Sequence, residues 1–377
     1  MKSNYDILGN HIRLIDTRNR ESITDRVLGI NIDKFFMPSV ANVIGTDLSK
    51  YKLITKGKFA CNPMHVGRDE RLPVALYDEE EPAIVSPAYF MFEVVDNSIL
   101  NEDYLMMWFR RPEFDRICWL HTDGSVRGGI TWDDICRLEL PIPPIEKQLE
   151  IVNSYKAITE RIALKKKIND NLDAQMRAYF KEFIGQSEPV SVGKLKDYCS
   201  MQYGYTETAT NEPIGSKFLR ITDIAQSYID WSAVPYCPIT DDNHQKYVLS
   251  EGDVVIARTG ATVGVAKMLG KNIPDAVFAS FLVRIRPNDD DYKYFFGLTI
   301  TSKEFLEFVQ TNAGGSAQPQ ANPPLLGEYD ISLPDKENLI GFNQRIACFL
   351  NIIENNEMEI TKLNEVKTSM IEMLSSR

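Results

Sequence analysis

Polar side chains that can hydrogen-bond to the edges of nucleic-acid bases gather in loop-like stretches of this 377-residue chain. Arginine matches the two acceptors of guanine, asparagine and glutamine match adenine, and serine, threonine and tyrosine are general donors. In the first half of the chain the candidates are Arg18, Asn19, Arg20, Arg68, Arg71, Ser125 and Arg127. In the second half they are Tyr203, Tyr205, Thr206, Arg258, Thr259, Gln318 and Gln320. The same side chains also suit phosphate contacts or a solvated surface, so they mark regions more than single contacts.

Two other patterns would suit catalysis, and both are incomplete. Asn322-Pro323-Pro324-Leu325 is close to the Asn-Pro-Pro-aromatic motif with which amino-methyltransferases hold a flipped base, but the aromatic residue is missing. The stretch also lacks a preceding glycine-rich loop suited to a methyl donor. Pro274-Asp275 and Asp291-Tyr292-Lys293 show the loose spacing of a metal-dependent nuclease, which chance often produces. We therefore expect no catalytic residues and a chain that is not an enzyme.

The cysteines and histidines predict neither a metal site nor disulfides. None of the six cysteines forms a Cys-x-x-Cys pair, and the four histidines do not cluster with them. The start of the chain has no apolar signal core, and no apolar run approaches the roughly 20 residues that span a bilayer. A cytoplasmic protein with no membrane contact is expected.

The net charge of −11 argues against nucleic acid, because phosphate binding favours lysine and arginine. No segment of the chain is a basic block. A nucleic-acid binder of this composition must concentrate its arginines on one face or use the charge of partner subunits.

The second half of the chain repeats the first at an offset of 191 residues. Asp123-Gly124-Ser125 aligns with Gly314-Gly315-Ser316, and Leu140-Pro141-Ile142-Pro143-Pro144 aligns with Ile331-Ser332-Leu333-Pro334-Asp335. The match continues without gaps to the C-terminus and weakens upstream. Such duplication predicts a molecule with two heads.

Each half ends in about 40 residues without internal proline, entered through a proline or a capping aspartate, which predicts a long helix. A heptad frame predicts the apolar seam of a coiled coil, in the same register in both helices. In the first helix the seam contains Ile151, Tyr155, Ile158, Ile162, Lys165, Leu172 and Met176. In the second it contains Phe342, Ile346, Phe349, Ile353, Asn356, Ile360 and Leu363.

An internal repeat is most simply satisfied when the two helices pack antiparallel about a pseudo-two-fold axis. Lys165 and Asn356 would then face each other as a polar layer, a device that commonly sets register. A rod of about 38 residues would measure roughly 57 Å, more than one turn of DNA. The alternative is that both helices are core elements of a larger bundle.

The heads are expected to be α+β with mixed sheets. Alternating stretches predict strands at 58–62 and 89–94 in the first head, followed by a helix that begins near Asn101. In the second head they predict strands at 218–221, 253–257, 263–268 and 278–286, and a helix from Ser302 to about Thr311.

The run from Leu249 to Gly264, the later Gly314-Gly315-Ser316-Ala317-Gln318-Pro319-Gln320 and a proline-led long helix resemble the specificity subunits of type I restriction-modification systems. In the first head the stretches that resemble another lineage of such target-recognition domains are Arg18-Asn19, Tyr51-Lys52, Phe59-Ala60, Ile84 to Tyr89 and Ser125-Val126-Arg127. The order head, helix, head, helix extends the resemblance over essentially the whole chain.

The resemblance implies an α+β fold with two pseudo-symmetric target-recognition domains separated by two long antiparallel coiled-coil helices. The expected boundaries are 1–143 for the first domain, 144–186 for the first helix, 187–334 for the second domain and 335–377 for the second helix. It also implies a non-catalytic reader of double-stranded DNA, each head recognising half of a bipartite, asymmetric target.

The resemblance further implies the partners and cofactors of a phage-defence complex. Two modification subunits would dock on the helices, bind S-adenosylmethionine and methylate adenine, and restriction subunits would add ATP and magnesium. This chain itself would bind no cofactor.

Two other functions remain compatible with the sequence. The acidic charge favours a two-headed scaffold that binds other proteins, and Asn322-Pro323-Pro324 admits a free-standing adenine methyltransferase.

Overall fold

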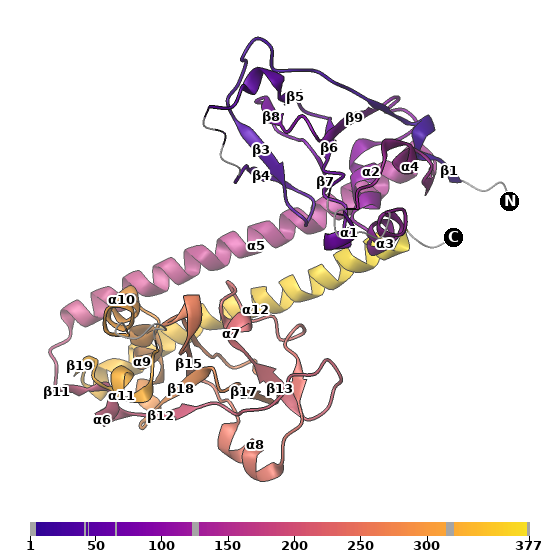
Figure 1. The fold of residues 1–377 in the computed structure, drawn as a ribbon. Coiled ribbons are helices and arrows are strands. Elements are labelled where there is room, and N and C mark those ends of the chain that lie inside the picture. Colours follow the sequence, from indigo (N-terminus) through magenta and orange to yellow (C-terminus); the bar gives the residue numbers. More distant parts are fainter. Residues whose placement is uncertain are drawn as a thin grey trace. The chain divides into compact units, whose positions relative to one another are not determined.

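The computed structural model describes residues 5–40, 43, 45–64, 66–122, 128–313 and 320–374, and these form two compact units (Figure 1). The first unit comprises Met1–Arg161 and Asn364–Arg377, and the second comprises Ile162–Leu363. The two long helices α5 (Ile145–Gln186) and α12 (Lys336–Met373) each contribute to both units. The chain thus has the expected α+β class with two heads and two long helices.

The first head carries two four-stranded sheets and one two-stranded sheet. Its strands are β1 (Tyr5–Ile7), β2 (Ile12–Leu14), β3 (Val27–Ile30), β4 (Phe36–Pro38), β5 (Lys52–Ile54), β6 (Phe59–Cys61), β7 (Val74–Leu76), β8 (Ala83–Val85), β9 (Phe90–Val94) and β10 (Glu139–Pro141). The order β2-β9-β6-β7 is antiparallel throughout, whereas β4-β3-β8-β5 contains the parallel pair β3 and β8. Strands β1 and β10 form the small sheet. The mixed sheet agrees with the sequence expectation.

Four short helices complete the first head: α1 (Val66–Asp69), α2 (Glu102–Phe109), α3 (Pro112–Leu120) and α4 (Trp132–Cys136). Two 3-10 turns, η1 (Leu8–Asn10) and η2 (Leu48–Lys50), connect strands. Helix α2 begins near Asn101 as expected, and Asn101 caps it, its side chain accepting from the backbone N–H of Tyr104 at 3.0 Å.

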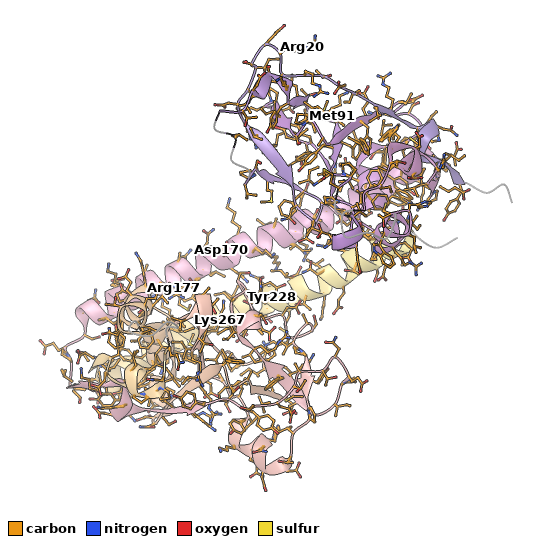
Figure 2. All side chains as sticks on the ribbon, viewed as in Figure 1. Arg20, Met91, Asp170, Arg177, Tyr228 and Lys267 are labelled. Atoms are coloured by element: carbon orange, nitrogen blue, oxygen red, sulfur yellow. The ribbon has the colours of Figure 1, made fainter. Side chains whose placement is uncertain are left out.

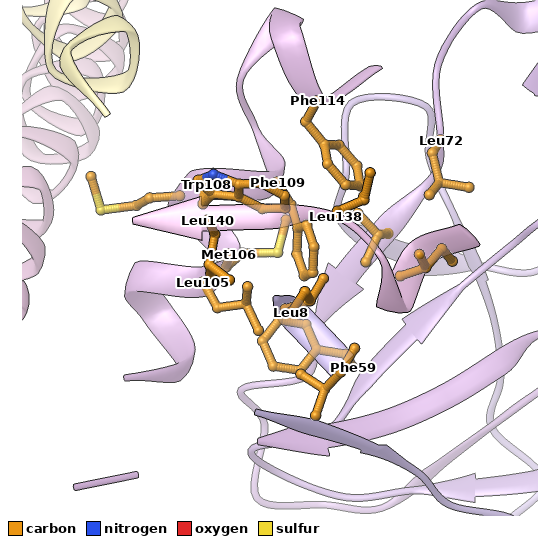
Figure 3. Close-up of a cluster of buried hydrophobic side chains, with 14 of the residues drawn as sticks. Leu8, Phe59, Leu72, Leu105, Met106, Trp108, Phe109, Phe114, Leu138 and Leu140 are labelled. Carbon is orange, nitrogen blue, oxygen red and sulfur yellow. The ribbon is translucent and has the colours of Figure 1, made fainter. Parts of the chain in front are cut away.

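Aromatic side chains fill the core of the first head (Figure 3). Trp108 and Phe114 have ring centres 5.3 Å apart, and Phe109 lies 4.9 Å from Phe114. Each of the three is at most 1% exposed. Their burial fixes α2 and α3 against the antiparallel sheet, whose Phe59 belongs to the same cluster.

The second head repeats this topology. Its strands are β11 (Ser191–Lys194), β12 (Cys199–Tyr203), β13 (Ser216–Leu219), β14 (Tyr236–Cys237), β15 (Val254–Ala257), β16 (Ala266–Met268), β17 (Ala276–Phe278), β18 (Leu282–Pro287) and β19 (Asp330–Leu333). The antiparallel sheet has the order β12-β18-β15-β16, the mixed sheet has the order β14-β13-β17 with β13 parallel to β17, and β11 pairs with β19. Each sheet of the second head thus has a counterpart in the first.

The helices repeat as well. The second head contains α6 (Leu195–Tyr198), α7 (Ile221–Ile224), α8 (Asp241–Tyr247), α9 (Lys293–Ile300), α10 (Lys303–Asn312) and α11 (Pro323–Gly327), with 3-10 turns η3 (Gly260–Thr262) and η4 (Asp290–Tyr292). Helices α9, α10 and α11 each begin 191 residues after α2, α3 and α4. The repeat is therefore structural as well as sequential.

One strand prediction in the second head is wrong. The run 278–286 was expected to form a single strand, but the structure divides it into β17 and β18, which belong to different sheets. The break falls at Ala279-Ser280-Phe281, where the Ser280 N–H donates to the Tyr205 carbonyl at 2.8 Å. A continuous apolar run does not reveal such a break, because both of its parts are buried strands.

The seam residues face inward in both units. In the first, Val152 and Tyr155 of α5 share a core cluster with Ile371 of α12 and with Leu374, which follows it. In the second, Phe342 stacks on Phe183 with ring centres 4.4 Å apart. Lys165 contacts Asn356 and the later Asn169 contacts the earlier Ile353, so the helices pack antiparallel in the second unit.

A polar layer interrupts the seam within the second unit. Lys165 Nζ donates to Asn356 Oδ1 at 2.7 Å and lies 2.8 Å from Glu359 Oε2. Asn356 Nδ2 donates to Asn169 Oδ1 at 2.7 Å, and Asn169 Nδ2 donates to the Ile353 carbonyl at 3.3 Å. The pair Lys165 and Asn356, expected from the heptad frame, is present and belongs to a larger network.

A second polar contact joins α12 to the second head. Burial raises the pKa of Glu357 from 4.5 to about 7, although the nearby Lys267 ammonium acts in the opposite direction. Lys267 Nζ donates to the Ser227 carbonyl at 2.6 Å, and burial lowers the pKa of Lys267 (Figure 2).

Within the described ranges, no helix combines the length and apolar character needed to cross a membrane.

Replacing Asn356 with Ala should lower the free energy of unfolding by about 1–3 kcal/mol, because Lys165 and Asn169 lose their buried partner. Replacing Lys165 and Asn356 together with Leu should recover part of that loss, since no buried ammonium then lacks its partner and apolar burial is added. Urea denaturation of the single and double variants measures both effects. A double variant that is no more stable than Asn356→Ala would contradict a shared network.

Glu357 should make stability depend on pH. Its folded-state pKa is raised, so its contribution is fully present below about pH 4.5 and is lost as the pH rises through about 7. Glu357→Gln should remove this loss and raise stability at pH 8 by about 1–3 kcal/mol relative to the wild-type chain. Thermal unfolding at pH 5 and pH 8 measures the difference, and an equal change at both values would contradict the assignment.

Candidate nucleic-acid interface

Arg258 is the centre of a polar and aromatic surface on the second head. It directly follows β15, and its guanidinium carbon lies 4.7 Å from the centre of the Tyr203 ring at the end of β12. Its Nη1 donates to the Ser280 carbonyl at 3.3 Å, while its buried Nε has no hydrogen-bond partner among the described residues. The tyrosine face and the single acceptor hold the guanidinium in place and leave donors available for an outside acceptor.

Two exposed aromatic side chains flank this arginine. Tyr203 is 41% exposed and Phe281 is 61% exposed. The Arg258 N–H donates to the Phe281 carbonyl at 3.0 Å, which fixes the turn that presents the ring. A large exposed aromatic ring beside a cation is a typical contact for bases or sugars. We call Tyr203, Arg258 and Phe281 the Arg258 face.

Thr259 and Gln320 lie beside the Arg258 face. They form an isolated antiparallel bridge, and the Ala321 N–H donates to the Arg258 carbonyl at 2.9 Å. Gln320 is exposed and Thr259 is partly exposed. Gln318 lies outside the described residues. The structure thus brings Tyr203, Arg258, Thr259 and Gln320 together from three distant stretches of sequence.

Tyr205 turns away from this surface, whereas Thr206 is exposed. The Tyr205 N–H donates to the Phe278 carbonyl at 2.8 Å, and its ring lies 5.3 Å from that of Tyr247. A Cβ on the preceding Gly204 would come within 2.2 Å of the Ala279 carbonyl oxygen. This close approach requires glycine, and it positions Tyr205 as a packing residue.

Arg18 of the first head is occupied by internal contacts. Its Nη1 donates to the Lys50 carbonyl at 2.7 Å, and its Nη2 lies 2.7 Å from Asp16 Oδ1. The hydrogen bond from Arg18 and, more weakly, the charge of Lys52 hold the pKa of Asp16 below its usual value. Arg18 therefore shapes the loop that precedes Arg20.

The prediction that Asn19 contacts a base is wrong, because this residue is buried. Its side chain is 1% exposed, its Nδ2 donates to the Thr24 carbonyl at 2.8 Å, and its Oδ1 accepts from the Ile23 N–H at 2.9 Å. A buried amide that is satisfied in this way cannot read a base. Asparagine suits both roles because its side chain can cap a turn as well as it can bind adenine.

Arg20 is the exposed candidate of this loop. Its side chain extends from the tip of the first head (Figure 2), and it has no ion pair within the described part of the chain. The side-chain hydrogen bonds of Asn19 stabilise the turn that contains Arg20. The two neighbours thus have different roles, one supporting the loop and the other available at its surface.

Arg71 belongs to an internal ion network. Its Nη1 lies 2.8 Å from Asp33 Oδ1, and its Nε lies 3.6 Å from Asp115 Oδ2. Asp115 Oδ1 also accepts from the buried Lys34 Nζ at 2.6 Å. Arg68 lies in α1, and Ser125 and Arg127 fall outside the described residues. The first head therefore offers Arg20 as its clearest described contact.

The two catalytic-looking patterns have structural explanations. Asn322 caps α11, its Oδ1 accepting from the Leu325 N–H at 3.0 Å, as Thr131 caps α4 in the first head. Asp275 accepts from Ser216 Oγ at 2.7 Å and pairs with His244. Among the described side chains, no group of three or more could hold a metal ion.

Sequence reasoning missed Ser280 and Phe281. It extended one strand through both residues, which placed them inside a sheet. The available signal was a polar residue next to an aromatic residue within an otherwise apolar run.

Comparison with known proteins connects these features to one family. Residues 188–368 match the family model described as the type I restriction modification DNA specificity domain. The Type I restriction enzyme MjaVIII specificity subunit of Methanocaldococcus jannaschii is 24% identical over 267 residues, which are 63% of this chain and 61% of that protein. The chain thus spans about three fifths of the length of this relative.

A solved structure shares the fold. The S subunit of a type I restriction-modification system from M. genitalium aligns over 99% of this chain and 96% of its own, with a TM-score of 0.60 and 14% identity.

Asn19→Ala should lower the free energy of unfolding of the first unit by about 1–3 kcal/mol, because the Ile23 N–H and the Thr24 carbonyl lose their partner. Tryptophan fluorescence during urea unfolding reports mainly on this unit, which contains Trp108, Trp119 and Trp132, whereas the second unit contains Trp231. Arg20→Ala is the matched control and should change stability by less than about 0.5 kcal/mol. Equal destabilisation by both variants would contradict the division of roles.

Proposed function

We propose that this chain, which belongs to the specificity subunits of type I restriction-modification systems, reads DNA for its complex and leaves the chemistry to partner subunits. The family match supports DNA recognition as the role of the second head. The repeat of sheets and helices in the first head supports the same role there.

Each head would read one half of a bipartite target. The observation that carries this proposal is that the two heads share a scaffold but differ in the loops that carry their exposed polar side chains. The second presents the Arg258 face, whereas the first presents Arg20 on a turn closed by Asn19. Identical heads would read a palindrome, so different loops support an asymmetric target.

In the second head, Arg258 would contact a base edge or phosphate, and Thr259 and Gln320 would add polar contacts. Its donors could pair with the acceptors of guanine. Tyr203 and Phe281 would pack on the sugar or base beside it. The partial exposure of Arg258 and its single internal hydrogen bond, from Nη1, support this role, because the other Nη donors remain for an added acceptor.

The long helices would fix the spacer between the half-sites and dock two modification subunits. Apolar side chains that point away from the seam support a protein interface, for example Leu164 at 59%, Ile340 at 65% and Ile352 at 47% exposure. The modification subunits would bind S-adenosylmethionine and methylate adenine. Restriction subunits would bind ATP and magnesium, and this chain would hold no cofactor.

The acidic balance fits a reader that depends on partners for much of its affinity. Several described cations of the heads are paired internally, including Arg18, Arg71 and Arg286. The same charge favours a two-headed protein scaffold as the second candidate. DNA binding should weaken steeply between 50 and about 200 mM salt, whereas a neutral protein interface should not. Binding that does not depend on salt would favour the scaffold.

Methylome sequencing of cells that carry this chain and its cognate modification subunit should show adenine methylation at one bipartite motif. Arg258→Ala should weaken discrimination at the second half-site by about 1–3 kcal/mol at the affected base pair and leave the first half-site unchanged. Asp223→Ala, which removes an ion pair with Arg220 elsewhere in the same head, is the control and should leave the motif unchanged.

Two results would count against the proposal. Absence of methylation at any bipartite motif would remove the DNA-reading role. Equal loss of discrimination at both half-sites would show that the heads do not act independently.

A further inference from the structure

Glu354 of α12 joins the long helix to the second head. Its Oε1 accepts from the Lys271 N–H at 2.8 Å, and its Oε2 accepts from Asn272 Nδ2 at 2.8 Å. Lys271 and Asn272 lie in the loop between β16 and β17. Both oxygens of one carboxylate therefore bind a single loop, which holds that loop in a defined position.

Gly270 makes room for this contact. A Cβ at this position would lie 1.4 Å from Glu354 Oε1, so any side chain would displace the carboxylate. Gly270 is not among the residues with positive φ. The glycine is therefore required by the approach of Glu354 and not by the conformation of the loop.

The loop belongs to the part of the second head that carries the Arg258 face. We call this part, which packs around the cluster of Val255, Ala257, Leu269 and Phe278, the Arg258 lobe. The buried cluster of this lobe contains Val255 and Ala257 of β15, Leu269 at the start of the loop and Phe278 of β17. Arg258 follows Ala257 directly. A displacement of the loop is thus transmitted through one packed cluster to Arg258.

An apolar core also attaches the second head to the helices. It combines Phe295 and Phe296 of α9 and Val254 and Ile256 of β15 with Leu339, Phe342 and Ile346 of α12. The loop after β16 adds polar contacts to α12, namely those of Glu354, and one turn further the charge of Glu357 interacts with Lys267. Polar contacts depend more on geometry than apolar contacts do, so they fix orientation.

The first half of the chain lacks this pair of carboxylates. The 191-residue offset places Ala163 at the position of Glu354 and Lys166 at the position of Glu357. The contact is therefore a property of the second head and not of the repeat.

We propose that Glu354 is a positioning residue that fixes the Arg258 lobe on α12 and thereby sets how strictly the chain selects the length of the spacer between the half-sites. This inference rests on the proposed function. One added base pair moves a half-site by about 3.4 Å along the DNA and rotates it by about a tenth of a turn. A head whose orientation is fixed rejects such a site, whereas a loosened head accepts it.

The test uses the full chain with its modification subunit and a set of DNA targets that share both half-sites and differ in spacer by one base pair in either direction. Wild-type complex should methylate one spacer length. Glu354→Ala should reduce the preference for that spacer by about tenfold, the effect of losing two hydrogen bonds, and leave both half-site sequences unchanged. Gly270→Ala should reduce the preference for that spacer to the same degree, because its Cβ would displace the Glu354 carboxylate.

Two variants provide controls. Glu354→Gln should retain strict spacing, since its side-chain carbonyl can still accept from the Lys271 N–H and the Asn272 amide can reorient. Glu365→Ala changes an exposed carboxylate elsewhere on α12 and should have no effect. Strict spacing in Glu354→Ala, or a change in the half-site sequences that it accepts, would overturn the proposal.

Amide hydrogen exchange separates failure of this inference from failure of the proposed function. The Lys271 amide should exchange more rapidly in Glu354→Ala than in the wild-type chain, whatever the chain binds. An unchanged rate would overturn the positioning role. Absence of any bipartite methylation by the wild-type complex, with a faster Lys271 exchange in the variant, would instead reject the DNA-reading function alone.

Discussion

The antiparallel packing of α5 against α12 is the constraint on which the rest of the structure depends. Each compact unit contains a stretch of both helices, and the first unit is built from two separate pieces of sequence, Met1–Arg161 and Asn364–Arg377. The first unit is completed only when the end of the chain returns to it, where the buried Arg111 donates to the Leu374 carbonyl at 3.2 Å. The apolar seam adds stabilising burial to the core of each head, and the polar layer of Lys165 and Asn356 adds a requirement on register.

This arrangement explains how the heads can differ while the scaffold repeats. The helices α2 and α9 and the sheets beneath them pack on the seam, so their positions are constrained by the core. The end of β12 and the segments that follow β15 and β17 leave that core and carry Tyr203, Arg258 and Phe281. Changes in such loops alter recognition without disturbing the packing that holds each unit together.

Ion pairing explains much of the conflict between the acidic charge of the chain and the proposed reading of DNA. Arginines that resemble contacts in the sequence are already paired within the same head: Arg18 with the exposed Asp16, and Arg71 with the exposed Asp33 and the buried Asp115. Arg258 is held differently, by a ring and one carbonyl, and so retains donors for a ligand. The number of arginines therefore says less about binding than the partners that each one already has.

The sequence by itself determined the elements that depend on periodicity. The heptad frame located both long helices, their common register and the meeting of Lys165 with Asn356, because helical geometry places every seam residue on one face. The expected starts of two shorter helices, near Asn101 and at Ser302, agree with α2 and α10. Only the tertiary structure decided that Asn19 is buried, that residues 278–286 form two strands, and that Phe281 and Gln320 lie near Arg258. These outcomes depend on contacts between residues far apart in the chain, which no local pattern encodes.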